Sequence, residues 1–338
     1  MIEEITQHTF DTVLGHDIQK NVVRQLVDHD RMPPSMLFYG PSGVGKKSFI
    51  ISLVKYIQCK KGDAQKECDC TSCGKIKRGT FPDLVILGEK TRWQIKIEAT
   101  REMQDWAVVT PIEGRKKIIV LFGAERMNPA SANSLLKILE EPPRHLLIIL
   151  ETAHPYKMLP TIRSRCMGLK FSTIDPETIK DWLKEEKNMI VDRADVAAQL
   201  CEGRPGEAVK LAREELMSTR QTMLSELEIL ETHGFAALFR VADKMLKLDE
   251  YPLTLRLMLS YFRDLLVARA SPESENLLIH QDLLSHIKEK ATRIEFDAIY
   301  DSIMHILTSL SLSSRIINQQ LFMENLLITI GKNIRSGK

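Results

Sequence analysis

A phosphate-binding pattern stands out in the segment GPSGVGKKSF, which begins at Gly40. In the pattern G-x-x-x-x-G-K-[ST], backbone N–H groups and the lysine hold nucleotide phosphates, and the final hydroxyl binds Mg²⁺. Gly40, Gly45 and Lys46 occupy the motif positions, and Gly43 adds a further glycine within the loop. The hydroxyl position holds Lys47 instead. The segment therefore has the residues to bind phosphate but lacks the usual ligand for the metal.

The residues that such a loop needs for ATP hydrolysis are also missing from their usual sequence positions. An ATPase holds Mg²⁺ with the loop hydroxyl and with acidic residues at the end of a later strand. Ser48 comes one residue too late, since one helical residue is a rotation of about 100°. The strand candidate KIIVLF ends at Phe122 and is followed by Gly123, where an ATPase carries acids. We therefore predict a degenerate nucleotide site that does not hold ATP and Mg²⁺ productively, either a relic of the fold or a loop that binds without hydrolysis.

Four of the six cysteines lie close together in the sequence, at Cys59, Cys68, Cys70 and Cys73. Four thiolates in one short segment can surround a tetrahedral Zn²⁺, and such clustering in a reducing compartment favours metal over disulfides. All four ligands would come from the protein, so no coordination position is left for a substrate. We predict a structural zinc site over residues 59–73. A reduced loop without metal, or a cluster in which another ligand replaces one thiol, is the alternative.

Alternating strand and helix signals position these residues in the first half of the chain. Short apolar runs predict buried strands between helices, which is typical of a parallel α/β sheet. The strand candidates are 36–40, 83–87, 117–122 and 146–152, with a last one ending near Phe171. The segment 45–58 predicts a helix directly after the glycine loop. Strand, loop and helix thus follow one another as a phosphate-binding loop requires.

Helical periodicity replaces the strand signal after Ser172. The sequence predicts an α/β domain over residues 1–172 that includes the cysteine segment, a small helical domain over 173–213 and an all-helical domain over 214–338. No apolar run approaches the roughly 18 residues needed to cross a membrane. The first residues are polar, unlike a signal peptide, so we expect a cytoplasmic protein. The net charge of +2 excludes a basic surface over the whole chain, so any nucleic-acid contact must be local.

The order of these motifs resembles that of the bacterial DNA polymerase III clamp-loader family, an AAA+ assembly. The resemblance covers roughly residues 8–172 and rests on the phosphate loop and on the segments TFDTVLGHD (9–17), SCGKIKRGTFPDL (72–84), ASANSLLKILEEPP (130–143) and LPTIRSRC (159–166). It implies an α/β P-loop AAA+ domain, then a small helical lid domain and an all-α collar domain that holds subunits together. The helical remainder matches loosely, though RIINQQLFMENLL (315–327) resembles the family's collar helix.

The family contains ATP-hydrolysing motor subunits, gamma or tau, and a largely inert stator subunit, delta-prime. Lys47, Phe122 and Gly123 stand where a motor subunit needs Ser or Thr and two acids. Gly206, in the segment GRPGEA, stands where the lid of a motor subunit carries a nucleotide-sensing arginine. These departures resemble the delta-prime type. We therefore expect no ATPase activity from this chain alone, although it would belong to the DNA polymerase III holoenzyme.

The resemblance gives a catalytic role to Arg165, in the triplet Ser164–Arg165–Cys166. In the family this arginine reaches across a subunit interface to ATP bound by the neighbouring motor subunit, and so acts in trans. A surface arginine or a structural salt bridge is the alternative. The implied partners are the gamma or tau subunits and the delta subunit, with the sliding clamp and primer-template DNA met through the assembly. The implied location is the nucleoid-associated replisome in the bacterial cytoplasm, with no membrane contact.

Two other functions stay open from the sequence. One is an active gamma- or tau-type ATPase motor subunit of the same assembly, which would hydrolyse ATP with Mg²⁺ as an isolated chain. The other is an unrelated zinc-dependent nucleic-acid-binding protein, which would bind DNA tightly without partners and lose it on zinc chelation. The near-neutral net charge of +2 disfavours the latter.

Overall fold

The computed structural model describes residues 10–61, 68, 70–88, 97–187, 189–212, 215–248, 251–312 and 318–335. The chain forms two compact units. The first comprises Met1–Ile179 with Gly203–Gly206, and the second comprises Lys180–Glu202 with Glu207–Lys338. Parts of three sequence predictions lie outside the described residues: residues 1–9 of the α/β domain, 62–67 and 69 of the zinc segment, and 315–317 of the collar helix. The three predicted domain boundaries stay predictions.

The first unit is built around a five-stranded sheet with strand order β2-β3-β4-β1-β5. The strands are β1 (Ser35–Tyr39), β2 (Leu84–Leu87), β3 (Lys117–Phe122), β4 (Leu146–Thr152) and β5 (Met167–Lys170). Every pairing is parallel, so the C-terminal ends of the strands lie at one edge of the sheet. The sequence predictions for these strands are confirmed, with boundaries shifted by no more than one residue.

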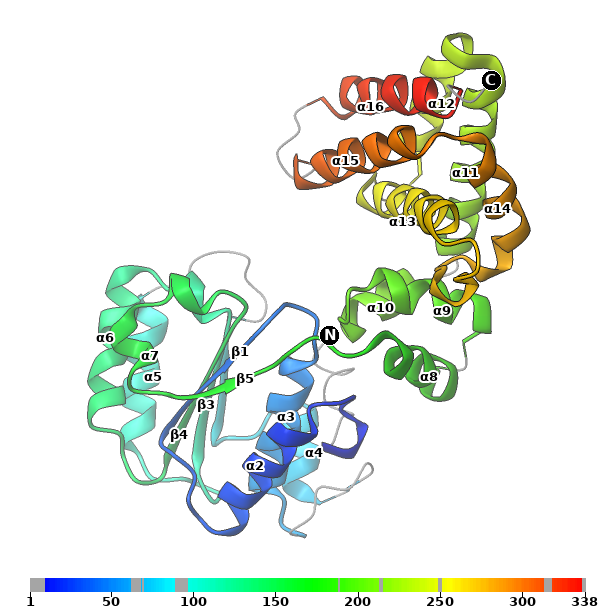
Figure 1. Ribbon diagram of the computed structural model, residues 1–338. Helices are drawn as coiled ribbons and strands as arrows, with labels where there is room; N and C mark the ends of the chain where they lie inside the picture. Colours follow the sequence, from blue (N-terminus) through cyan, green and yellow to red (C-terminus); the bar gives the residue numbers. More distant parts are fainter. Residues whose placement is uncertain are drawn as a thin grey trace. The chain divides into compact units, whose positions relative to one another are not determined.

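Helices cover both faces of the sheet (Figure 1). Along β3 the side chains alternate, with Ile118 and Val120 in one apolar core and Ile119 and Leu121 in another. This alternation is the two-residue period of a strand. The first core also receives side chains from α2 (Asp17–Asp28), α3 (Lys46–Gln58) and α4 (Thr71–Lys77), and the second from α5 (Ile97–Val108), α6 (Pro129–Glu140) and α7 (Pro160–Arg163).

After β5 the described chain is helical, which confirms the predicted loss of strands. The helices are α8 (Pro176–Lys187), α9 (Val191–Leu200), α10 (Pro205–Leu211), α11 (Glu215–His233), α12 (Leu238–Leu246), α13 (Tyr251–Ala270), α14 (Leu284–Arg293), α15 (Phe296–Leu312) and α16 (Gln319–Asn333). None of the described helices is both long enough and apolar enough to cross a membrane. The parallel α/β sheet followed by helices is the fold class that the sequence predicts.

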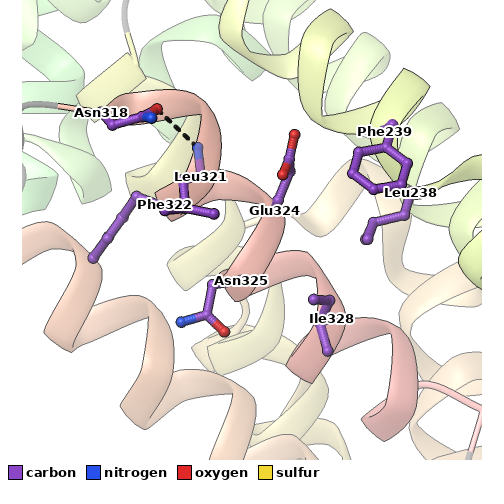
Figure 2. Close-up of a pocket in the computed structure, with 8 residues that line it drawn as sticks. All are labelled: Leu238, Phe239, Asn318, Leu321, Phe322, Glu324, Asn325 and Ile328. Carbon is purple, nitrogen blue, oxygen red and sulfur yellow. Dashed lines mark hydrogen bonds between the residues drawn. The ribbon is translucent and has the colours of Figure 1, made fainter.

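Two apolar surfaces lie on the helical unit. The first is a groove of about 440 Å³ between α12 and α16 (Figure 2). Its apolar lining consists of Leu238, Phe239, Leu321, Phe322 and Ile328. The second surface is a stripe on α15, formed by Phe296, Tyr300, Met304 and Leu307, each between 43% and 52% exposed. Spacings of three and four residues place these side chains on one face of the helix.

Candidate functional site

The phosphate-loop segment connects β1 to α3, as the sequence predicts. Gly40, Gly43 and Gly45 have φ angles of 148°, 84° and 105°, which glycine adopts readily. At Gly40 the requirement is also steric, because a Cβ atom would lie 2.1 Å from the carbonyl oxygen of Phe171. The loop thus has the backbone shape that its glycines allow, and α3 begins at Lys46.

The Lys46 side chain is buried, with only 3% of its surface exposed. Its Nζ donates hydrogen bonds to the carbonyl oxygens of Gly40 (2.7 Å) and Pro41 (2.8 Å). The same Nζ lies 3.1 Å from Oε1 of Glu151. Two carbonyl oxygens thus accept hydrogen bonds from the ammonium group, and one carboxylate oxygen lies in an ion pair with it. A phosphate that reached Lys46 would compete with these three oxygens.

Glu151 is the acidic residue of this site, and it comes from β4 instead of β3. Its Oε2 accepts a hydrogen bond of 3.1 Å from the backbone N–H of Gly123. β4 pairs with β1, and Glu151 is in register with Phe38, one residue before β1 ends. The sequence pattern did not identify Glu151, because in that pattern the acidic residues follow the run KIIVLF and not the run LLIILET. The available signal was an acid inside the apolar run LLIILET.

Two of the three residues that stand where the ATPase pattern has its metal ligands, Lys47 and Phe122, contact each other. Nζ of Lys47 lies over the ring of Phe122, 5.1 Å from its centroid. This distance is within the range of a cation–π interaction. Ser48 lies one residue further along α3, and its carbonyl oxygen accepts a hydrogen bond from Ser52. A cation and an aromatic face thus stand where a hydroxyl and a carboxylate would bind the metal.

Other polar groups beside the loop bind within the protein. The hydroxyl of Thr152 donates to Glu125 Oε2 at 2.7 Å and accepts from the N–H of His154 at 2.9 Å. The N–H of Gly206 donates to the carbonyl oxygen of Gly43 at 2.9 Å. A Cβ atom on residue 206 would lie 3.2 Å from that oxygen. Glycine suits this close approach, whereas an arginine would require the loop to shift.

His16 supports the loop from the N-terminal side. Its Nε2 lies 2.7 Å from the carbonyl oxygen of Val44, and its ring packs edge-on against Phe171 at 4.8 Å. Burial lowers the pKa of His16, so the ring is neutral near pH 7 and Nε2–H donates to Val44. The loop backbone is therefore held from within the same unit.

Arg165 lies at the surface, between α7 and β5. Its Nη2 is 2.8 Å from Oε1 of Glu140 at the end of α6, and Nη1 donates to the carbonyl oxygen of Thr161 at 3.1 Å. The side chains of Arg165 and Glu140 are 37% and 51% exposed. The hydroxyl of Ser35 donates to the carbonyl oxygen of Arg165 at 2.6 Å. The backbone is thus attached to β1 while the guanidinium stays accessible.

The loop and Arg165 lie at opposite ends of strand β1. The backbone of Arg165 contacts Ser35, the first residue of β1, and the loop follows Tyr39, the last. A strand rises about 3.3 Å per residue, so the five residues of β1 separate the two sites by roughly 16 Å. This separation exceeds the reach of an arginine side chain. Arg165 therefore cannot contact a phosphate held by its own loop.

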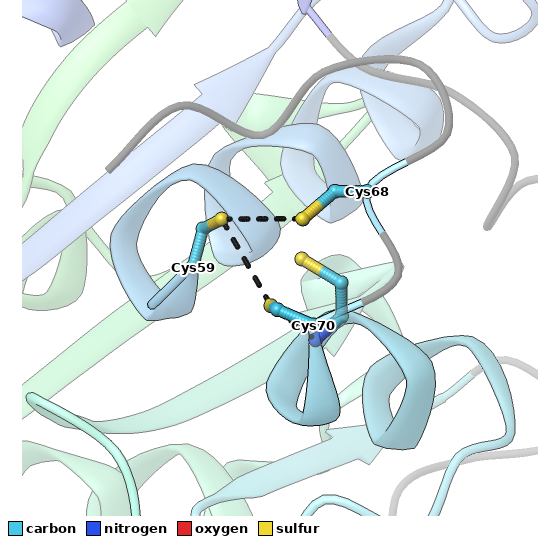
Figure 3. Close-up of side chains that lie close together, drawn as sticks. Cys59, Cys68 and Cys70 are labelled. Carbon is cyan, nitrogen blue, oxygen red and sulfur yellow. Dashed lines mark hydrogen bonds between the residues drawn. The ribbon is translucent and has the colours of Figure 1, made fainter. Parts of the chain in front are cut away.

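The four predicted cysteine ligands come together beyond the C-terminal end of α3, and Figure 3 labels three of them, Cys59, Cys68 and Cys70. Their sulfur atoms all lie within 4.8 Å of one another. Cys59 Sγ is 3.6 Å from Cys68 Sγ and 4.0 Å from Cys70 Sγ, and Cys73 lies in the first turn of α4. Four sulfurs around a tetrahedral zinc, each about 2.3 Å from the metal, would be about 3.8 Å apart. The donor set and its size therefore fit zinc.

One of these thiols ionises easily. Burial opposes the ionisation of Cys70, but the N–H groups of Cys73 and Lys60 donate toward its sulfur and lower its pKa to about 6. Burial raises the pKa of Cys59 and of Cys73. Cys70 thus offers a thiolate to a cation, and the thiols of Cys59 and Cys73 would release protons as a metal binds.

Comparison with known families gives two matches in order along the chain. A model described as DNA polymerase III, delta subunit, matches residues 15–175. A model described as DNA polymerase III, delta subunit, C terminal, matches residues 214–332. The two models together span the sheet, the loop, Arg165 and most of the C-terminal helices.

Individual proteins match over nearly their full lengths. DNA polymerase III subunit delta' of Bacillus subtilis (strain 168) is 29% identical over 323 residues, which is 93% of this chain and 97% of the relative. Subunit delta' of Escherichia coli (strain K12) is 27% identical over 306 residues, 90% of each chain. A solved structure of a gamma subunit-related protein from Thermotoga maritima aligns with a TM-score of 0.48 and 20% identity, covering 93% of this chain and 99% of the other. From the two family models and the full-length relatives we conclude that the chain belongs to the DNA polymerase III delta-prime family of clamp-loader subunits, as the sequence predicts.

Proposed function

We propose that this chain is the stator subunit of a DNA polymerase III clamp loader and helps to place the sliding clamp on primed DNA. Its own nucleotide site is degenerate, and Arg165 completes the ATP site of a neighbouring gamma or tau motor subunit. The delta subunit and further motor subunits would complete the ring. The observation that carries the proposal is the ion pair of Lys46 and Glu151, which fills the phosphate loop with the chain's own charges.

A nucleotide would bind this loop weakly, because its phosphate must compete with Glu151 for Lys46. Both side chains are at least nine-tenths buried. Separating a buried ion pair leaves an uncompensated charge, which is destabilising by about 3–5 kcal/mol when one partner is removed. Each 1.4 kcal/mol of such a penalty weakens binding about tenfold. The loop can therefore keep the shape of a phosphate-binding site without holding ATP at cellular concentrations.

The Mg²⁺ ion that accompanies ATP would also find no suitable ligand at the positions of Lys47 and Phe122. Lys47 and Phe122 stand at the two metal-binding positions, and the ammonium group repels a divalent cation. Catalysis of phosphoryl transfer depends on such a metal to neutralise the developing charge. Hydrolysis in this chain's own site therefore lacks both a free lysine and a metal ligand.

Arg165 suits a catalytic role toward a neighbouring subunit. Its guanidinium is accessible, and its backbone is held at the edge of the sheet opposite to the loop. An arginine supplied in trans to a transferring phosphoryl group accelerates the reaction by roughly 10³–10⁵. The alternative role, a structural salt bridge, would explain little, because an exposed ion pair contributes only about 0–1 kcal/mol.

The cysteine cluster would hold a structural zinc that connects the C-terminal end of α3 to the first turn of α4. Four protein thiolates leave no open position, so the metal would take no part in catalysis. We expect one zinc per purified chain, measured by atomic emission, and loss of the metal in Cys73→Ser. Cys201→Ala, which changes a buried cysteine in the helical unit, is the matched control and should retain zinc.

The two apolar surfaces of the helical unit suit assembly into a ring. The groove between α12 and α16 and the exposed stripe on α15 differ in shape and composition. Contacts between unlike surfaces join subunits head to tail, which is how rings form. We propose that this collar region receives a different neighbouring subunit on each of the two surfaces.

Calorimetric titration of ATP and Mg²⁺ into the purified chain distinguishes the stator from a motor subunit. The stator predicts no binding up to millimolar concentrations and no hydrolysis, because Lys46 is paired with Glu151. A motor subunit predicts micromolar binding and a Mg²⁺-dependent rate. Either of these results would overturn the proposal of a degenerate site.

A further inference from the structure

Arg165 is held by an acidic residue, Glu140, that the proposed function does not yet use. Nη2 of Arg165 lies 2.8 Å from Oε1 of Glu140, and Nη1 donates to the carbonyl oxygen of Thr161. We propose that Glu140 is a positioning residue for the trans-acting arginine, and that it holds the guanidinium in the orientation from which Arg165 meets a neighbour's phosphate. This inference rests on the proposed function of Arg165.

The geometry leaves most of the guanidinium available. An arginine carries five N–H donors. Nη1 donates one N–H to the carbonyl oxygen of Thr161, and Nη2 lies in an ion pair with Glu140. Within the described part of the chain Thr161 is the one group that accepts a hydrogen bond from this side chain, so Nε, the second donor of Nη1 and at least one donor of Nη2 remain. Glu140 can therefore hold the arginine while phosphate oxygens bind its other donors.

Glu140 lies at the C-terminal end of α6, where a carboxylate is more favourable with a cation beside it. α6 ends at Glu140, shortly before Pro142 and Pro143, which cannot continue a helix. The C-terminal end of a helix carries a partial negative charge, which disfavours a carboxylate and favours a guanidinium. A glutamate in this last turn is unfavourable by itself and becomes favourable when Arg165 lies beside it. The C-terminal end of α6 and the carboxylate of Glu140 thus both attract the guanidinium of Arg165.

The remaining contacts of Arg165 fix its backbone and leave its side chain to Glu140 and Thr161. Ser35 binds the carbonyl oxygen of Arg165, and the N–H of Arg165 donates to Ile162 at 3.1 Å. Without Glu140, the long side chain would sample many rotamers, since arginine has one of the largest side-chain entropies. Reactions that depend on orientation lose rate when a catalytic group is no longer pre-positioned.

The test is a double-mutant cycle in the reconstituted clamp loader, with single-turnover ATP hydrolysis as the readout. The variants are Glu140→Ala, Arg165→Ala and their combination. Glu140→Gln keeps an acceptor oxygen for Nη2 and serves as the conservative rescue. Glu141→Ala is the matched control, because Glu141 is the exposed neighbour of Glu140 and forms no ion pair with any described residue.

We expect Glu140→Ala to slow the hydrolysis that depends on Arg165 by roughly tenfold, with the ATP concentration at half-maximal rate unchanged. Glu140→Gln should retain most of the rate, and Glu141→Ala all of it. In the Arg165→Ala background, Glu140→Ala should have no further effect, because the residue through which it acts is gone.

The cycle separates failure of this inference from failure of the proposed function. If Arg165→Ala slows hydrolysis and Glu140→Ala does not, the positioning role is wrong and the trans-acting arginine stands. An equal effect of Glu140→Ala with and without Arg165 would also overturn the positioning role. If Arg165→Ala itself leaves hydrolysis unchanged, the proposed function of Arg165 is wrong and the inference falls with it.

Discussion

An ion pair between a basic residue and a glutamate lies near each end of strand β1. The two pairs are chemically similar, but they differ in how deeply they are buried. Beyond its C-terminal end, Lys46 pairs with Glu151, and the two side chains are 3% and 10% exposed. Beside its N-terminal end, Arg165 pairs with Glu140, and these are 37% and 51% exposed. The first pair lies inside the protein where a phosphate would bind, and the second lies on the surface.

Burial decides what each cation can do. Lys46 donates to two carbonyl oxygens and lies in a buried ion pair with Glu151, so an incoming phosphate would compete with these protein groups. Arg165 keeps free donors and a weak, exposed partner, which is what the proposed contact with a neighbouring subunit's phosphate needs. Lys46 is thus buried within the fold, while the guanidinium of Arg165 is accessible, as the proposed role between subunits requires.

Of the replacements considered for the two ion pairs, that of Glu151 should have the largest effect on the free energy of unfolding. Glu151→Ala leaves the buried Lys46 without its counter-charge and should lower the free energy of unfolding by about 3–5 kcal/mol. Urea denaturation of the isolated chain measures this. If Glu151→Ala does not fold, Glu151→Gln serves, since it keeps an acceptor for the N–H of Gly123. A change below 1 kcal/mol in both variants would contradict the distinction by burial.

The same replacement should open the phosphate loop. With Glu151 changed to Gln, Lys46 can meet a phosphate without separating an ion pair, so ATP should bind at least about tenfold more tightly than to the unchanged chain, a difference of about 1.4 kcal/mol. Calorimetry with ATP, with and without Mg²⁺, measures the gain. Equal affinities for the variant and the unchanged chain would mean that Glu151 does not close the loop.

We expect a smaller effect on stability from the contact between Lys47 and Phe122. Lys47→Ala and Phe122→Leu should show a coupling energy of about 0.5–2 kcal/mol in a double-mutant cycle on stability, as a partly desolvated cation–π pair does. Thermal and urea unfolding of the four chains measure the coupling. Additive effects would show that the two side chains do not stabilise each other.

The smallest stability effect should come from the exposed pair. Glu140→Ala should change the free energy of unfolding by at most about 1 kcal/mol, because both side chains remain solvated. The measurement is the same urea titration that is used for Glu151→Ala. A loss comparable to that of Glu151→Ala would make Glu140 and Arg165 a structural pair and would remove the contrast between the two ends of β1.

Some of this architecture follows from local sequence patterns. β3 and β4 match their predicted bounds, since each is a continuous apolar run buried on both faces. The glycine loop and the cysteine cluster were also predictable, because each depends on residue types at short spacings. Lys47 and Phe122 were identified as departures from an ATPase pattern for the same reason.

The contacts that explain those departures depend on strand order, which a single sequence does not display. Glu151 reaches Lys46 because β4 lies beside β1, although 105 residues separate the two side chains in the chain. Glu140 meets Arg165 only after α6 and α7 pack on the same face of the sheet. Periodicity and motif spacing carry no information about such long-range pairing, so the sequence predicted the cations and missed both carboxylates.

The most direct measurement of the central claim compares the two cations in one assay. Clamp loaders are reconstituted with the unchanged chain, with Arg165→Ala, or with Lys46→Met/Glu151→Gln, which removes the lysine without leaving a buried charge. Single-turnover hydrolysis is then followed in each. We predict that Arg165→Ala slows the one ATP site it serves by about 10³-fold or more, and that the loop variant hydrolyses ATP like the unchanged assembly. Unchanged hydrolysis with Arg165→Ala, or a loss with the loop variant in an intact assembly, would contradict the account.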